Sequence, residues 1–308
     1  MTTLQLRDLN NAIERDERAF ITARERAYRD SVTACADSVL TNLYRSPIIL
    51  LAGPSGSAKT TTANRIRAAL EQRGVKTHMI SLDDYYLDFS PEVYPKTETG
   101  EPDLESPLGL DIPLLNQQLE QLAKGEEILV PRFDFTVHAR DRQWHQPLQL
   151  QKDEAVVFEG LHALNPMFTN RHPDAFRLYV STQTDLYDGQ TLLLPHEWTR
   201  LLRRCVRDMY HRNSPIEETL ALWSNVRRGD HLFIRPFSYL AHRQIDSSLY
   251  YEWPALGSVA APLFQALSRD VPEGDTIQSL CDVLQRIAPV PLDLIPRTSL
   301  LREEFLQS

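Results

Sequence analysis

The sequence predicts an α/β fold in which a mainly parallel sheet lies between two layers of helices. From residue 47 onward, apolar segments with strand character alternate with helical segments, and the expected strands cover residues 48–52, 76–82, 155–158 and 175–181. The helix after the first strand should begin at Lys59 and stop near Gly74. Such alternation favours a parallel sheet that binds ligands at the carboxyl ends of its strands.

A phosphate-binding loop is predicted between the first strand and its helix. The pattern matches G-x-x-x-x-G-K-S/T except at Ala58, where the second glycine is expected. Loop N–H groups would point at phosphate oxygens, Lys59 can neutralise charge between the terminal phosphates, and the Thr60 hydroxyl can ligate magnesium. A methyl group at Ala58 costs little at negative φ but would crowd the β-phosphate in a glycine-only conformation. The loop comprises Gly53, Pro54, Ser55, Gly56, Ser57, Ala58, Lys59, Thr60 and Thr61.

Composition limits the classes of protein to consider. The chain has 308 residues, 42% of them hydrophobic, which is enough for a core in one large or two modest domains. No apolar run is long enough for a membrane span, and residues 1–10 do not resemble a secretion signal. A net charge of −9 argues against nucleic-acid binding, and three widely spaced cysteines favour reduced thiols in the cytoplasm. The expected partner is a small molecule, and a homo-oligomer is left open.

Three regions are expected along the chain. Residues 1–46 are charge-rich without Gly or Pro, and apolar residues such as Leu4, Leu9 and Ile13 recur near helical spacing, which predicts a helical N-terminal arm. Residues 47–255 form the core, including an arginine-rich helical lid at about 197–229, and residues 256–308 form a helical tail packed on the core. Within the lid, Ser214 and Glu217 predict a capping box that starts a helix at Pro215, which would stop at Gly229.

Acidic residues follow two of the predicted strands. Asp83 and Asp84 come after the strand expected beside the phosphate-loop strand, where a carboxylate can accept a proton from a hydroxyl that attacks the γ-phosphate and can also meet the metal. Glu159 ends another apolar strand and would bind magnesium directly or through water. The competing interpretations are an Asp pair that caps a turn and a surface acid at a strand end.

Four arginines recur at helical spacing in the lid. Their guanidinium groups could close over the transferring phosphoryl group, or they could form a solvated basic face paired with Asp208. They are Arg200, Arg203, Arg204 and Arg207.

The order of these motifs resembles the uridine kinase and phosphoribulokinase family of P-loop kinases, and is most similar to its bacterial uridine-kinase-like branch. The resemblance covers roughly residues 47–305 and rests on segments 53–61, 83–86, 131–138, 158–166, 203–208, 223–229 and 295–305. It implies a three-layer P-loop kinase fold that uses ATP and a magnesium ion (Mg²⁺).

The resemblance also implies roles for individual residues. Asp83 would be the catalytic base and a metal neighbour, Lys59, Thr60 and Glu159 would handle phosphates and magnesium, and Arg207 would touch ATP phosphates. The residues implied on the acceptor side are Tyr86, Glu105 (or Asp103 in its place), Phe133, His138 and Arg204. A structural role for His138 is an equally weighted alternative.

Departures from the family pattern lie mostly on the acceptor side. Phe133 replaces the usual Tyr, and Ser214 and Leu222 stand where uridine kinases supply an Arg and a Gln to the nucleoside. Loss of these hydrogen-bonding groups weakens recognition of a pyrimidine edge. Residues 190–198 replace a shorter entry to the lid helix and could cover the pocket.

The sequence therefore predicts an ATP-dependent kinase acting on a hydroxyl of a small nucleoside-like or sugar-containing metabolite. Uridine or cytidine is the leading candidate, followed by another hydroxylated metabolite such as a pentose phosphate. A different class is a nucleotide-binding regulator that acts through its N-terminal arm with little transfer. A catalytic protein should keep an acid-lined acceptor site beside Asp83, which a regulator could fill with its own side chains.

Overall fold

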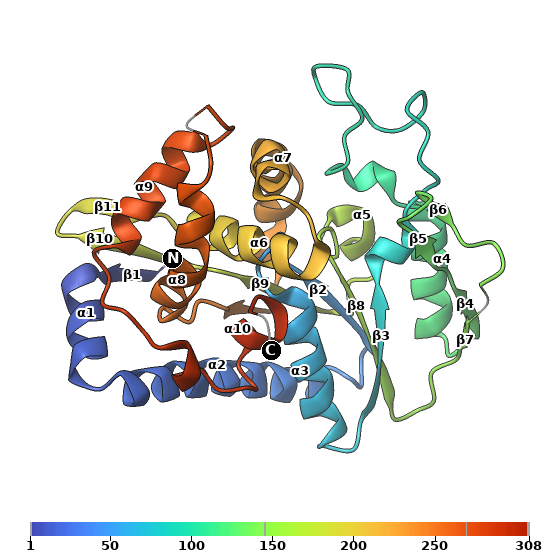
Figure 1. Cartoon of the computed structure of the whole chain (residues 1–308). Helices are drawn as coiled ribbons and strands as arrows, with labels where there is room; N and C mark the ends of the chain where they lie inside the picture. Colours follow the sequence, from blue (N-terminus) through green and yellow to red (C-terminus); the bar gives the residue numbers. More distant parts are fainter. Residues whose placement is uncertain (1, 145, 269, 307–308) are drawn as a thin grey trace.

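A five-stranded parallel sheet forms the centre of the protein (Figure 1). The computed structural model describes residues 2–144, 146–268 and 270–306. The strands follow the order β12-β9-β2-β8-β3, and every neighbouring pair is parallel. The mainly parallel sheet expected from the sequence is thus confirmed. The strands are β2 (Ile48–Ala52), β3 (Lys76–Ser81), β8 (Glu154–Gly160), β9 (Phe176–Ser181) and β12 (Arg243–Asp246).

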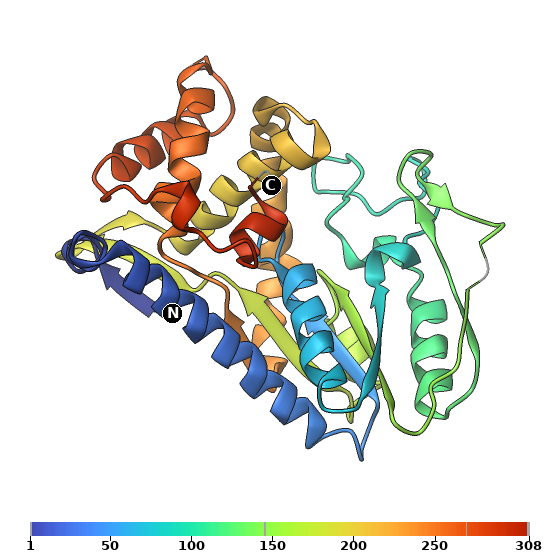
Figure 2. The ribbon, with the colours of Figure 1, turned by 60° about the horizontal axis from the view of Figure 1, so that its bottom comes forward.

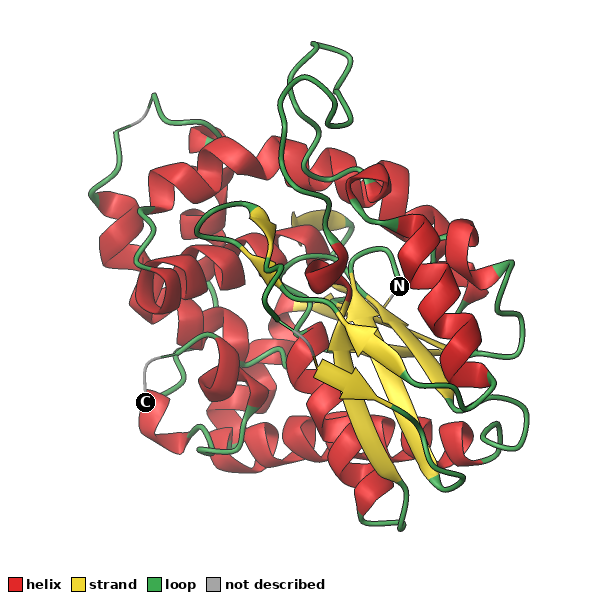
Figure 3. Ribbon diagram, turned by 90° about the vertical axis from the view of Figure 1, so that its right-hand side faces the viewer, coloured by secondary structure: helices red, strands yellow, loops and turns green. Residues whose placement is uncertain are grey.

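Helices cover both faces of this sheet (Figures 2 and 3). On one face, Ile49 and Leu51 share a core with α2 (Glu17–Leu40) and α3 (Lys59–Glu71). On the other, Ile48 and Leu50 share a core with α4 (Ile112–Ala123) and α5 (Pro166–Thr169). Successive side chains of a strand point to opposite faces, so a continuously apolar β2 supplies both cores.

The N-terminal segment is helical except at its start. It contains β1 (Thr2–Gln5), α1 (Leu6–Arg15) and α2. The expectation of a helix at Leu4 is wrong, because residues 2–5 pair in parallel with β10 (Thr184–Asp188), which pairs in turn with β11 (Thr191–Leu194). An available strand edge overrides the local helical spacing.

The arginine-rich segment forms two helices, α6 (His196–Arg212) and α7 (Ile216–Gly229). Asn213 ends α6 in the left-handed conformation, with a φ of 52°. The predicted capping box is wrong, because the Ser214 hydroxyl donates to the Glu218 carboxylate at 2.6 Å instead of capping the helix. The chain does not turn away at Gly229 but continues as a π-helical turn, Asp230–Ile234. A Cβ at Gly229 would lie 2.4 Å from the Glu105 Cβ, so this close approach requires glycine.

The C-terminal part contains α8 (Glu252–Gln265), α9 (Gly274–Leu284) and α10 (Leu300–Glu304). Two short antiparallel pairs complete the fold, β4 (Ile128–Val130) with β7 (Gln146–Leu148), and β5 (Phe133–Asp134) with β6 (Ala139–Arg140). Among the described helices, none combines the length and apolar character needed to cross a bilayer.

Candidate active site

The predicted donor-site residues lie at one edge of the sheet. The phosphate-binding loop follows β2, Asp83 follows β3, and Glu159 lies near the end of β8. Glu159 is in register with Leu51 of β2 on one side and Ser81 of β3 on the other. Three segments that are far apart in the sequence therefore meet at the carboxyl ends of adjacent strands, where α/β sheets bind ligands.

Ala58 takes the conformation that the missing glycine would favour. Its φ is 63° and its ψ is 36°, in the left-handed region, and it lies directly before α3. This conformation costs a residue with a Cβ about 1 kcal/mol or more. The loop is closed by backbone hydrogen bonds from Ser57 N to Pro54 O at 3.1 Å and from Thr62 N to Ala58 O at 3.0 Å. Ala58 is therefore a strained position within an otherwise ordered loop.

Thr60 and Glu159 form a pair that fits a magnesium ion. The Thr60 hydroxyl donates to Glu159 Oε1 at 3.1 Å. Glu159 is buried, and its Oε2 atom has no hydrogen-bond partner among the described residues. Burial raises the pKa of this carboxyl group, while the nearby Lys59 charge opposes the rise. A buried carboxylate oxygen without a partner beside a threonine hydroxyl matches the hard oxygen ligands that magnesium prefers.

The two neighbouring aspartates differ in their surroundings. Asp84 Oδ1 accepts a hydrogen bond from the Phe133 backbone N–H at 3.2 Å, and burial raises the pKa of the Asp84 carboxyl group. The Asp83 carboxylate accepts no hydrogen bond within the described part of the chain, and its charge contributes to the raised pKa of Glu159. Asp84 thus positions the β5 segment. Asp83 remains available to a ligand beside the Thr60–Glu159 pair.

Of the four lid arginines, Arg204 contacts the phosphate-binding loop and Arg207 pairs with an acid of the lid. Arg204 Nη1 donates to the Ser55 hydroxyl of the phosphate-binding loop at 2.5 Å. Arg207 Nη2 pairs with Asp208 Oδ1 at 2.7 Å, and Thr219 of α7 donates to the other oxygen of Asp208 at 3.2 Å. Asp208 therefore orients Arg207 and ties α6 to α7.

The other two lid arginines are structural. Arg200 pairs with Asp230 at 2.7 Å, and Arg203 pairs with Glu252 at 2.5 Å with both side chains fully buried. For Arg200 and Arg203, the predicted closure over the phosphoryl group and the alternative of a solvated basic face are therefore both wrong. The reason is that α6 packs against α7 and α8, while Asp230 directly after α7 and Glu252 of α8 supply the carboxylates.

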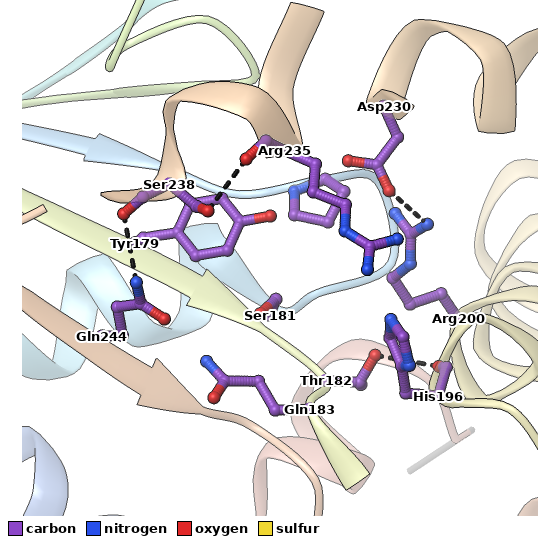
Figure 4. A pocket seen from close by; sticks show the side chains of 11 residues that line it. Tyr179, Ser181, Thr182, Gln183, His196, Arg200, Asp230, Arg235, Ser238 and Gln244 are labelled. Carbon is purple, nitrogen blue, oxygen red and sulfur yellow. Dashed lines mark hydrogen bonds and ion pairs between the residues drawn. The ribbon is translucent and has the colours of Figure 1, made fainter. Parts of the chain in front are cut away.

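A polar cavity of about 120 Å³ is lined by Arg200 and by Pro54 of the phosphate-binding loop (Figure 4). Sequence analysis did not identify it, because its walls come from five separate segments and carry no contiguous motif. Figure 4 shows Arg200 bound to Asp230, with the Arg235 side chain beside them. Its other lining residues are Tyr179, Ser181, Thr182, Gln183, His196, Ser238 and Gln244.

Aromatic residues gather near Asp83 on the acceptor side. The rings of Tyr86 and Phe133 have centroids 5.8 Å apart, and those of Phe133 and Phe135 are 5.0 Å apart. Phe133 is buried, whereas Phe135 is exposed. His138 lies at the exposed turn of the β5–β6 hairpin with a φ of 52°, and its ring centroid is 6.2 Å from that of Phe89. Tyr86 and Phe133 are therefore brought together, while His138 lies at the hairpin tip.

The structure separates the two acids considered for the acceptor. Asp103 pairs with Arg228 of α7 at 2.5 Å, whereas Glu105 packs against Gly229. Burial raises the pKa of Glu105 to about 7, although the Arg204 charge opposes the rise. Asp103 thus has a structural partner, and Glu105 is the acid close to the lid and to Arg204.

Glu105 should make stability depend on pH. Its pKa rises from 4.5 to about 7 on folding, so between these values the folded protein binds more protons than the unfolded chain. The free energy of unfolding should therefore fall as pH rises through this window. We expect Glu105→Gln to remove this contribution, which denaturant unfolding at a series of pH values measures. Identical pH profiles for the wild type and the variant would contradict the raised pKa.

Comparison with known proteins identifies the family of the chain. Residues 48–248 match the model of the Phosphoribulokinase / Uridine kinase family, and the chain belongs to this family of kinases. It is similar to a protein named uridine kinase from Staphylococcus haemolyticus, with 32% identity over 195 residues that cover 63% of this chain and 84% of that protein. A uridine kinase of Brevibacillus brevis is 31% identical over 198 residues, covering 62% and 80% of the two chains.

A solved structure described as a putative fructose transport system kinase from a Silicibacter species is also similar. Its TM-score is 0.49 at 18% identity, and the match covers 66% of this chain and 95% of that one.

Proposed function

We propose that this protein is a magnesium-dependent kinase that transfers the γ-phosphate of ATP to a hydroxyl of a small nucleoside-like or sugar-containing metabolite. The observation that carries this proposal is the meeting of the phosphate-binding loop, the Thr60–Glu159 pair and the free Asp83 carboxylate at adjacent strand ends. Family membership supports the same reaction class.

On the donor side, the N–H groups of residues 53–61 and the Lys59 ammonium bind the phosphates. Thr60 and Glu159 would hold a magnesium ion with Asp83 beside them, and such an ion would supply positive charge against the phosphates. Arg204 and Arg207 stabilise negative charge on the transferring group, since α6 places Arg204 against the loop at Ser55.

On the acceptor side, Asp83 accepts the proton of the attacking hydroxyl. A bond forms between that oxygen and the γ-phosphorus, the bond to the β–γ bridging oxygen breaks, and ADP leaves. Tyr86 and Phe133 offer aromatic surface to the acceptor, and Glu105 holds its hydroxyls. Arg204 and the hairpin residue His138 are the other residues proposed to bind the acceptor.

We propose that the acceptor site makes different contacts from those that a uridine kinase makes with its pyrimidine nucleoside. Uridine and cytidine lead because relatives carry the name uridine kinase. Leu222, however, is 51% exposed and cannot replace the amide hydrogen bonds of a Gln. Residues 191–194 form β11 and pair with β10, at the opposite side of the molecule from the β5–β6 hairpin, so they do not cover the acceptor site (Figure 1).

The test is steady-state phosphorylation of uridine, cytidine and a panel of sugar and sugar-phosphate acceptors at saturating MgATP. Two missing hydrogen bonds of about 1 kcal/mol or more each should reduce kcat/KM for uridine roughly ten- to a thousandfold relative to a dedicated uridine kinase. Efficient and selective uridine turnover would show that the departures at Ser214 and Leu222 do not matter. ATP binding without turnover of any acceptor would instead favour the regulator.

A further inference from the structure

Three helices that lie outside the family match surround the phosphate-binding loop and the first turn of α3. The family model matches residues 48–248, and α2, α8 and α10 lie outside these residues. Figure 2 shows α2 running alongside α3, with α10 beside the start of α3. The contacts of these helices reach the backbone of the loop itself.

The first contact comes from α2. The buried Tyr28 hydroxyl lies 2.7 Å from the Thr62 hydroxyl, which donates its own proton to the Ala58 carbonyl at 2.7 Å. Because the Thr62 proton is used in this way, Tyr28 must be the donor in the first bond. The chain Tyr28–Thr62–Ala58 therefore ends at the strained residue of the loop.

The second contact comes from α8 and α10 through Arg203. Arg203 Nη1 donates to the Gly56 carbonyl of the loop at 3.1 Å. The guanidinium is fixed by Glu252 of α8, and it lies over the Phe305 ring with its Cζ 5.1 Å from the ring centroid. Phe305 is fully buried, so the C-terminal segment holds the arginine that holds the loop.

A third contact lies on the first turn of α3. The Thr61 hydroxyl donates to Glu304 Oε2 at 2.7 Å, and Arg65 one turn later pairs with Glu303 at 2.9 Å. Together with the two contacts above, these bonds attach residues 56, 58, 61 and 65 to the ends of the chain.

We propose that Tyr28 and Phe305 are positioning residues that hold the phosphate-binding loop in its nucleotide-binding conformation. The loop needs these contacts from α2, α8 and the C-terminal segment because of Ala58. Its left-handed conformation costs about 1 kcal/mol or more where glycine would cost nothing. A loop that relaxes in the absence of ligand must be reordered on binding, which lowers affinity. This inference rests on the proposed function, since it concerns the binding of ATP.

The expected result is a selective loss of nucleotide affinity. Tyr28→Phe removes one buried hydrogen bond worth about 1 kcal/mol, so we expect the Kd and the KM for MgATP to rise roughly fivefold. Phe305→Leu should act in the same direction through Arg203. The KM for the acceptor should stay unchanged in both, because the contacts of these residues lead to Thr62 and Arg203 rather than to the proposed acceptor residues.

The matched control is Tyr250→Phe. It also removes a tyrosine hydroxyl that takes part in a partly buried hydrogen bond, which it accepts from Thr184 at 3.2 Å. That bond does not reach the loop. Kd is measured directly with a fluorescent ATP analogue and by calorimetry with MgATP, alongside thermal unfolding. A lower Tm with an unchanged Kd in Tyr28→Phe would overturn the proposal, because that is what a merely structural residue does.

The Ala58→Gly background provides the sharper test. Glycine removes the strain, so Tyr28→Phe should weaken MgATP binding less in this background than in the wild type, a non-additivity that a double-mutant cycle measures. Equal losses in both backgrounds would overturn the link to Ala58. If Phe305→Leu does not fold, Tyr28→Phe carries the test alone. If the wild type does not bind MgATP, the proposed function is overturned. If the wild type binds MgATP and the variants bind it equally well, only the inference about Tyr28 and Phe305 is overturned.

Discussion

Turnover is expected to fall by at least about a hundredfold when Lys59 is replaced by Ala, while the fold stays intact. Lys59 opens α3 at the phosphate-binding loop, and its charge acts on both Glu159 and Glu105. Removing one preorganised charge at the position where negative charge develops costs catalysis on this scale. The measurement is steady-state turnover of the folded variant at saturating MgATP and acceptor.

The control for Lys59→Ala is Lys124→Ala, which removes an exposed lysine that pairs with Glu120 at the end of α4. This variant should retain wild-type turnover, since exposed pairs of this kind contribute little. Near-normal turnover in a folded Lys59→Ala protein would show that the loop after β2 is not the donor site.

Asp83→Asn should suppress turnover by roughly a hundred- to ten-thousandfold and leave ATP binding largely intact. The amide is almost the same shape but cannot accept the proton of the acceptor hydroxyl. The decisive measurements are kcat with the preferred acceptor and a direct Kd for MgATP on the same protein.

Asp84→Asn is the matched comparison. An Asn side chain at this position still offers an oxygen to the Phe133 N–H, so the hydrogen bond that orders β5 can persist and turnover should fall only mildly. If Asp84→Asn were the damaging change and Asp83→Asn the mild one, the catalytic base would be Asp84.

Much of the donor site could be predicted because its signals are local. An apolar segment, a loop ending in Lys59–Thr60 and a helix are contiguous, and β2 and α3 begin at the predicted residues, Ile48 and Lys59. The positions of Asp83 and Glu159 followed from one rule, that the carboxyl ends of parallel strands meet at the same edge. The residue roles at this edge stay predictions that the variants above test.

Other features depended on partners far away in the sequence. Leu4 lies in a strand because it pairs with Leu186 of β10, 182 residues away, which no helical spacing within residues 2–15 could reveal. The four lid arginines have the same spacing signal, yet Arg200 and Arg203 are neutralised by Asp230 and Glu252 from later elements. Burial and charge pairing are properties of the packed chain, so a single helical segment cannot report them.

Strand and helix periodicity and the loop motif are local, so the sequence alone was enough to predict a parallel α/β sheet with a phosphate-binding loop and acids at its carboxyl edge. The folded chain was needed to see that Ala58 is left-handed, that Asp103 rather than Glu105 forms the ion pair with Arg228, and that Tyr28 and Phe305 contact groups that hold the loop. These outcomes depend on backbone conformation and on contacts between residues more than thirty positions apart, which form only when the layers pack.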